Sequence, residues 1–147
     1  MTDYEVRPAL ESESAQIKDL IHLVGINPMG LDWKRFLVAV EGSGRVIGCG
    51  QIKPHGADIL ELASIAVPPE FRGRGIARRI IEALLAQNPR PLYLMCAEHN
   101  GPMYEKFGFR QIESDEMPKY FYRIKKLFDV TKTLRQVDES LWIMKLG

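Results

Sequence analysis

The chain has 147 residues, of which 46% are hydrophobic and 27% charged, and its formal net charge is +1. These values are typical of one globular domain that is large enough to bury a core of its own. The near-neutral charge argues against a general nucleic-acid binder, which would carry a strong basic excess.

Cysteine usage and the N-terminal sequence favour a reduced setting. Cys49 and Cys96 both lie in apolar runs and are interpreted as small buried residues. No Cys/His spacing resembles a metal site, so no metal is expected. The first residues lack the apolar core of a signal peptide, and no apolar run approaches membrane-spanning length. We therefore expect a cytoplasmic protein with no membrane contact.

The first half of the chain alternates strand and helix patterns. Tyr4 to Ala9 predicts a strand, because apolar and charged residues alternate there. Ser12 and Ser14 offer N-caps to a helix that Gly25 ends. The apolar face of that helix holds Ile17, Leu20, Ile21 and Val24. Next we expect a short helical piece at 31–35, a hairpin of 36–41 and 45–53, a turn at 54–56 and a strand at 58–67.

The second half begins with an amphipathic helix from Gly75 to about Gln87, which Asn88 and Pro89 stop. Its buried face should hold Ile76, Ile80, Ile81, Leu84 and Leu85. We then expect a strand at 92–96, a short helix at 100–107, a strand beginning at 109–112 and a last strand at 141–146. No repeat or linker interrupts this order, so residues 1–147 are predicted to be a single domain.

The segment between 61 and 79 has the composition of a phosphate-binding loop. An apolar strand runs into a Pro-Pro turn, a loop with Gly73 and Gly75 follows, and a helix starts at once. Glycine lets the backbone approach a ligand closely, and the N–H groups of a helix start favour an anion. Guanidinium donors surround this point, namely Arg72, Arg74, Arg78 and Arg79. The alternative interpretation is a strand-to-helix turn with solvated arginines.

The pattern Arg72-x-x-Gly75-x-Ala77 resembles the Arg/Gln-x-x-Gly-x-Gly/Ala signature of the GNAT acetyltransferase superfamily. In that family the loop holds the pyrophosphate of acetyl-coenzyme A. The resemblance implies coenzyme contacts from Arg72, Gly73, Arg74, Gly75, Ile76, Ala77 and Arg78. The order of the expected helices and strands also resembles that of the family over essentially the whole chain.

The resemblance also implies an α+β fold, with a mixed, mostly antiparallel central sheet and helices on both faces. In the family two central strands splay apart, and here they would be 58–67 and 92–96. Strands that splay apart leave backbone N–H and C=O groups without a partner in the sheet, and such groups need other hydrogen-bond partners. By resemblance, the backbone of Ile65, Ala66 and Val67 binds the pantetheine arm and the acetyl carbonyl. An N–H fixed at that carbonyl would stabilise the tetrahedral intermediate.

A second marker is Met103-Tyr104-Glu105-Lys106-Phe107-Gly108-Phe109, which resembles the family's Leu-Tyr-Glu-Lys-x-Gly-Phe. In the family this tyrosine is the general acid for the departing thiolate, and the resemblance assigns that role to Tyr104. A phenol is protonated at pH 7 and can share its proton with a developing thiolate. The alternative is a core tyrosine that anchors its helix.

The sequence departs from the family pattern before this tyrosine. Many members have an asparagine seven residues ahead of it, where this chain has Ala97, and Asn100 lies only four residues ahead. The shortened loop is reminiscent of the acetyltransferase domain of N-acetylglutamate synthases, as is the Asp115-Glu116-Met117-Pro118-Lys119 segment. We take this looser similarity as a hint about the substrate.

The acceptor amine must lose a proton before it attacks, and Glu61 is the best candidate base. Its alternative is a strand carboxylate without a catalytic role. The three histidines, His22, His55 and His99, are each isolated. His99 lies nearest the presumed thioester end and merits a test, although we favour a loop histidine without a role. Cys96 is interpreted as packing rather than as an acetylated nucleophile. Trp33 and Phe36 fit either a wall of the acceptor pocket or the core.

An extra helix is expected from Met117 to Leu134, with apolar residues Tyr120, Ile124, Leu127 and Phe128 at helical spacing. Its basic residues are Lys119, Arg123, Lys125, Lys126, Lys132 and Arg135. They suit either a solvated face, which we favour, or a patch for an acidic substrate or the coenzyme's 3′-phosphate.

The sequence therefore predicts an acetyl-CoA-dependent N-acetyltransferase that acetylates a primary amine of a small molecule or peptide by direct attack. The acceptor stays open among amino acids, polyamines, aminoglycosides and peptide N-termini, and pairing into a homodimer is possible. A non-catalytic acyl-CoA sensor on the same fold is the main alternative. A nucleotide- or RNA-binding domain is disfavoured, because no base-stacking aromatic motif accompanies the arginines.

Overall fold

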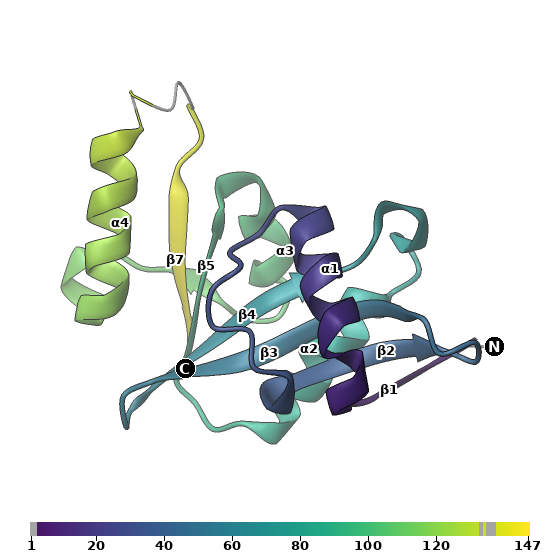
Figure 1. Cartoon of the computed structure of the whole chain (residues 1–147). Coiled ribbons are helices and arrows are strands. Elements are labelled where there is room, and N and C mark those ends of the chain that lie inside the picture. The colour runs from purple at the N-terminus through teal and green to yellow at the C-terminus, as the bar shows by residue number, and fades with distance from the viewer. Residues whose placement is uncertain (1–2, 133, 135–137) are drawn as a thin grey trace. The chain divides into compact units, whose positions relative to one another are not determined.

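The computed structural model describes residues 3–132, 134 and 138–147 of the chain (Figure 1). The strands of this part are β1 Tyr4–Pro8, β2 Phe36–Glu41, β3 Val46–His55, β4 Ile59–Ala66, β5 Leu92–Ala97, β6 Arg110–Gln111 and β7 Leu141–Leu146. The α-helices are α1 Ser14–Val24, α2 Ile76–Gln87, α3 Gly101–Glu105 and α4 Lys119–Thr131. Short 3₁₀ helices are η1 Glu11–Glu13, η2 Trp33–Arg35, η3 Pro69–Phe71, η4 Glu98–Asn100 and η5 Ser114–Glu116.

The sheet of the described residues has the order β1-β2-β3-β4-β5-β7-β6. Pairing is antiparallel for β1 with β2, β2 with β3, β5 with β7 and β6 with β7. The β4 and β5 strands run parallel, with Glu61 opposite Tyr93. The mixed, mostly antiparallel sheet predicted from the sequence is confirmed.

Contacts between residues divide the chain into two compact units. The first contains the described residues up to Lys53 together with Leu62–Pro89, and the second contains Pro54–Glu61 and the described residues from Arg90 onward. Each unit has a core of its own.

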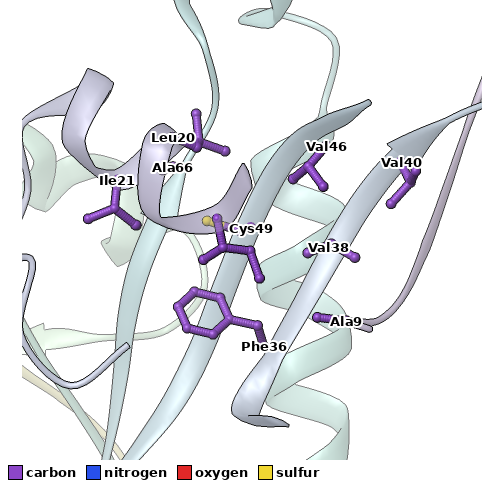
Figure 2. Packing of buried hydrophobic residues seen from close by; sticks show 10 residues of the cluster. Ala9, Leu20, Ile21, Phe36, Val38, Val40, Val46, Cys49 and Ala66 are labelled. Atoms are coloured by element: carbon purple, nitrogen blue, oxygen red, sulfur yellow. The ribbon is translucent and has the colours of Figure 1, made fainter. Parts of the chain in front are cut away.

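The core of the first unit lies between α1 and the β2–β3 hairpin. Figure 2 shows Leu20 and Ile21 of the helix beside Phe36, Val38 and further strand residues. The cluster is completed by Ala9, Ile17, Val40, Val46, Cys49 and Ala66. Because strand side chains alternate between faces, the opposite face of the hairpin carries Ala39, Gly48 and Gly50. This second face receives α2, so helices cover both faces of these strands.

Glycine is required where α2 meets β3. A Cβ added at Gly48 would lie 2.6 Å from Ile76, and one added at Gly50 would lie 2.9 Å from Ile80. Both isoleucines are buried, as is the whole set predicted for this helix face: Ile76, Ile80, Ile81, Leu84 and Leu85. The missing side chains on β3 therefore let α2 approach the strand closely.

The start of α1 differs from the sequence prediction. Neither Ser12 nor Ser14 caps the helix, because the N-cap residue is Glu13, which follows the η1 turn. The Glu13 carboxylate instead accepts hydrogen bonds from the backbone N–H of Leu10 at 2.8 Å and from Arg7 at 2.7 Å. The end of the helix is as predicted, with Gly25 at a φ of 79°.

The core of the second unit gathers Tyr93, Ile112, Phe121 and Ile143. Helix α4 lies beside β7 in Figure 1 and supplies Phe121, which is 0% exposed. The predicted apolar face of this helix is therefore wrong in part. Tyr120, Ile124 and Phe128 are half-buried, but Leu127 is 65% exposed and the unpredicted Phe121 is the buried anchor.

Candidate active site

The loop between β4 and α2 has left-handed backbone at its two glycines, as the sequence led us to expect. Gly73 and Gly75 have φ values of 81° and 77°, and a Cβ at either position would meet no atom within 4 Å. Gly75 is the N-cap of α2, and no side chain caps this end of the helix. The first-turn N–H groups of a twelve-residue helix therefore border an open loop, an arrangement that suits an anion.

The arginines of this loop are exposed, and each has a distinct contact. Arg72 donates from Nε to the Val67 carbonyl at 3.2 Å, which ties the loop to the residue that follows β4. Arg74 lies over the Phe71 ring, with 5.1 Å between guanidinium and ring centroid. The remaining two contacts are Arg78 with Glu82 at 2.7 Å and Arg79 over the Tyr4 ring at 5.0 Å. Arg72 thus shapes the loop as well as adding charge to it.

Strand β4 contains an irregularity that the sequence did not predict. Ser64 has a φ of 61°, in the left-handed region that β-branched and bulky residues avoid. Its hydroxyl accepts a 2.8 Å hydrogen bond from Gln51 Nε2, and its carbonyl is 3.5 Å from the Cys49 thiol. A residue with left-handed backbone inside a strand moves the backbone N–H and C=O groups that follow it out of register with the neighbouring strand, as in a β-bulge. Ile65 and Ala66, two of the predicted coenzyme contacts, come directly after this irregularity.

Tyr104 lies on α3 in the second unit. Its ring meets Phe109 edge-on, at 6.3 Å between centroids, and its carbonyl accepts hydrogen bonds from the N–H groups of Phe107 and Phe109. Burial raises the pKa of the Tyr104 phenol, and Cys96 raises it further. The phenol is therefore protonated throughout the neutral range and available as a donor.

Helix α3 approaches β7 closely through a glycine. A Cβ at Gly101 would lie 2.2 Å from two ring atoms of Trp142, so only glycine fits between the helix and this indole. Asn100, at the N-cap of α3, makes no side-chain capping bond. The contact with Trp142 fixes the start of the short helix that carries Tyr104.

Cys96 and His99 lie near the end of β5, where Cys96 lacks the environment of a nucleophile and His99 is paired with a carboxylate. Burial raises the pKa of the Cys96 thiol to about 11, with Glu139 adding to the shift, so this thiol is protonated at neutral pH. His99 binds the Glu139 carboxylate through its backbone N–H at 2.9 Å and through its ring nitrogen Nδ1. The interpretation of Cys96 as a packing residue fits its environment.

His55 and Glu61 face each other across the turn between β3 and β4. The distance from His55 Nε2 to Glu61 Oε1 is 2.7 Å. The predicted turn at 54–56 is wrong, because β3 continues through His55 and the turn occupies 56–58. This extension places His55 opposite Glu61. Sequence reasoning treated this histidine as isolated, and its spacing of six residues from Glu61 around Gly56 was the available signal.

Two residues that were predicted to line either the acceptor pocket or the core lie in the core. Phe36 is 2% exposed in the first core, and Trp33 packs against that core, so core packing accounts for both.

The exposed face of α4 has a shallow hollow, which is lined by Lys119, Tyr122, Arg123, Lys126, Leu127 and Val130. Arg135 lies outside the described residues. Among the described residues, no group of three or more His, Cys, Asp or Glu side chains gathers as a metal site would. No described helix is long and apolar enough to cross a membrane.

The sequence model of the acetyltransferase (GNAT) domain family matches residues 32–111, which are more than half of the chain. The chain belongs to the GNAT family of acetyltransferases. An uncharacterised N-acetyltransferase of Chlorobaculum tepidum is 29% identical over 92 residues, which are 60% of this chain and 57% of that protein. The chain therefore matches little more than half the length of this relative.

Two solved structures share the fold at lower identity. Rv2747 of Mycobacterium tuberculosis, in complex with CoA and NLQ, aligns with a TM-score of 0.73 at 21% identity, over 97% of this chain and 98% of that one. The N-acetylglutamate synthase of Neisseria gonorrhoeae, in complex with coenzyme A and N-acetyl-glutamate, aligns with a TM-score of 0.74 at 18% identity. That alignment covers 100% of this chain and 36% of the synthase. The predicted GNAT fold and the looser likeness to these synthases are confirmed at the level of fold.

Proposed function

We propose that residues 1–147 form one acetyl-CoA-dependent N-acetyltransferase domain that acetylates a primary amine by direct attack. The observation that carries the proposal is the loop of Gly73 and Gly75, whose left-handed backbone opens onto an uncapped helix start within the matched region. The family match spans residues of both compact units, which supports a single domain.

The coenzyme's pyrophosphate would be held by the loop from Arg72 to Arg78. Its donors are the first N–H groups of α2, and Arg74 and Arg78 add exposed guanidinium groups. The backbone of Ile65, Ala66 and Val67 would bind the pantetheine arm and polarise the acetyl carbonyl. CoA in the complexes of the two solved relatives supports this assignment.

Tyr104 would protonate the departing thiolate. Its raised pKa keeps the proton on the phenol until a strong base forms nearby. The raised pKa also makes the phenol a weaker acid, so Tyr104 would donate a hydrogen bond to the developing thiolate and give up its proton only as the C–S bond breaks.

Glu61 would take part in removing the proton from the acceptor ammonium. It is a buried carboxylate, 2% exposed, at the register position where β4 pairs with β5. For the acceptor, the N-acetyl-glutamate bound to the Neisseria synthase makes amino acids the first compounds to test. Polyamines, aminoglycosides and peptide N-termini complete the panel.

The test is an amine panel at fixed acetyl-CoA concentration, followed by the release of coenzyme A thiol. We expect turnover with at least one amine, and mass spectrometry should find the acetyl group on nitrogen. Binding of acetyl-CoA without acetylation of any amine would instead identify an acyl-CoA sensor. Sedimentation of the same protein tests whether it pairs into a homodimer.

A further inference from the structure

The pair of His55 and Glu61 is asymmetric in its access to solvent. The His55 side chain is 18% exposed and the Glu61 side chain 3%. An ammonium substrate or a water molecule can therefore reach the imidazole far more readily than the carboxylate. The imidazole is therefore the member of the pair that an acceptor proton can reach from solvent.

The hydrogen bond between them also selects one form of the imidazole. When Glu61 is ionised its carboxylate only accepts hydrogen bonds, and His55 Nε2 is then the donor across the 2.7 Å contact. In the neutral ring the other nitrogen, Nδ1, then holds a lone pair. Within the described residues no hydrogen bond is recorded for Nδ1, so this lone pair is available as a base.

Two aromatic side chains of α4 hold the imidazole. Tyr120 stacks on His55 with 3.8 Å between ring centroids and 24° between planes. Phe121 meets the ring edge-on at 6.0 Å and stacks on Tyr93 at 5.4 Å. A ring fixed this way keeps its orientation, and an imidazolium would lie over the face of the tyrosine, where a cation is stabilised.

We propose that His55 is the base that deprotonates the acceptor amine and that Glu61 is the positioning residue that holds its tautomer and balances the charge of the imidazolium. This rests on the proposed N-acetyltransferase activity and assigns its proton-accepting atom. The juxtaposition of a partly exposed imidazole, a buried carboxylate and a stacked tyrosine carries it.

The protons balance in two steps. His55 Nδ1 takes one proton from the acceptor ammonium and passes it to solvent, and the free amine attacks the thioester carbonyl. When the C–S bond breaks, the thiolate receives a proton from Tyr104. The second nitrogen proton then returns to Tyr104 through water, so one proton is released for each acetyl group transferred.

Few titratable groups face His55 in the part of the chain that the structure describes. They are Glu61 from β4 and Tyr120 from α4. Burial raises the pKa of Tyr120, and the charge of Glu61 raises it further, so this phenol is neutral across the assay range. Tyr120 therefore adds no charge beside the pair.

The experiment is the pH dependence of kcat/KM for one amine in the full-length parent and in His55→Gln, with His22→Gln as the matched control on the exposed face of α1. A lost base costs about a hundredfold or more. We expect that loss at pH 7 for His55→Gln, with partial recovery at high pH and an unchanged shift in melting temperature on adding acetyl-CoA. Glu61→Gln should also lower the rate, because the imidazolium loses its counter-charge and the ring loses the acceptor that fixes its tautomer.

A second variant separates chemistry from folding. His55→Ala should regain part of its activity when free imidazole is added, in proportion to the concentration of the neutral form. A His55→Gln variant with the kcat/KM of the parent would overturn the assignment and leave the proposed function standing. A parent that binds acetyl-CoA but acetylates no amine would overturn the proposed function, and this assignment with it.

Discussion

The two compact units differ in what their functional groups are made of. In the first unit the candidate site is mainly backbone, with left-handed glycines, a helix start and strand N–H groups near Ser64, to which Arg74 and Arg78 add charge. In the second it is side chains: the Tyr104 phenol and the pair of His55 and Glu61. Substitutions of the loop glycines should therefore affect binding of the coenzyme, whereas substitutions of polar side chains in the second unit should affect transfer of protons.

The largest effect should come from placing a charge at the backbone site. Gly75→Asp adds a carboxylate beside the proposed pyrophosphate, and a like-charge contact costs several kcal/mol, which corresponds to at least about a hundredfold weaker binding. Gly75→Asn is the matched control, because asparagine also tolerates a positive φ but carries no charge. Titration calorimetry with acetyl-CoA measures both. Equal losses in the two variants would mean that backbone strain, and not phosphate repulsion, weakens binding.

Tyr104→Phe tests the side-chain site without touching the backbone site. The ring and its contact with Phe109 remain, and only the proton donor is lost. A general acid contributes about a hundred- to ten-thousand-fold, so kcat should fall at least about tenfold while the affinity for acetyl-CoA changes little. Single-turnover kinetics at saturating acetyl-CoA measure this. An undiminished kcat would assign the thiolate proton to another donor.

Gly101→Ala should affect stability rather than chemistry. The new Cβ would lie 2.2 Å from Trp142, and overpacking of this kind costs about 1–3 kcal/mol of unfolding free energy. Urea denaturation followed by tryptophan fluorescence measures the loss. Gly42→Ala is the control, since a Cβ there meets no atom within 4 Å. Equal stability of the two variants would show that α3 shifts away from β7 at little cost.

The smallest effect is expected at the Arg7–Glu13 ion pair. The side-chain hydrogen bond from Arg7 lowers the pKa of Glu13 from its ordinary value of 4.5. A carboxyl whose pKa is depressed on folding stabilises the protein above its unfolded pKa and loses that contribution as pH falls through the folded value. Glu13→Gln should therefore cost about 1 kcal/mol at pH 7 and progressively less below about pH 4.5. Urea melts at several pH values check this, and a pH-independent cost would contradict it.

Features set by nearby residues were predicted well. The buried face of α2 follows from its apolar spacing, and β7 has the bounds expected of the 141–146 run. The glycine loop was predictable because its conformation depends on Gly73 and Gly75 themselves. Periodicity and turn chemistry act over a few residues, so one sequence suffices to read them.

Features set by tertiary contacts were missed. Glu13 rather than a serine lies at the start of α1 because Arg7, on the preceding strand, pairs with it. Phe121 replaces Leu127 as the anchor of α4 because Tyr93 of β5 stacks on it. The proposed role of His55 depends on Glu61 and on Tyr120, which lies 65 positions after His55 in the sequence. No local pattern links these residues, so the pair of His55 and Glu61 required coordinates.

The thiols of this protein also determine how its activity can be followed. Cys49 and Cys96 are both free, and burial raises their pKa values to about 12 and about 11. Only thiolate reacts with disulfide or alkylating reagents, and the raised pKa values keep both side chains in the thiol form near pH 8. A chromogenic disulfide reagent can therefore stay in the cuvette during turnover, and the absorbance that accumulates will count coenzyme thiols with little contribution from the enzyme's own cysteines.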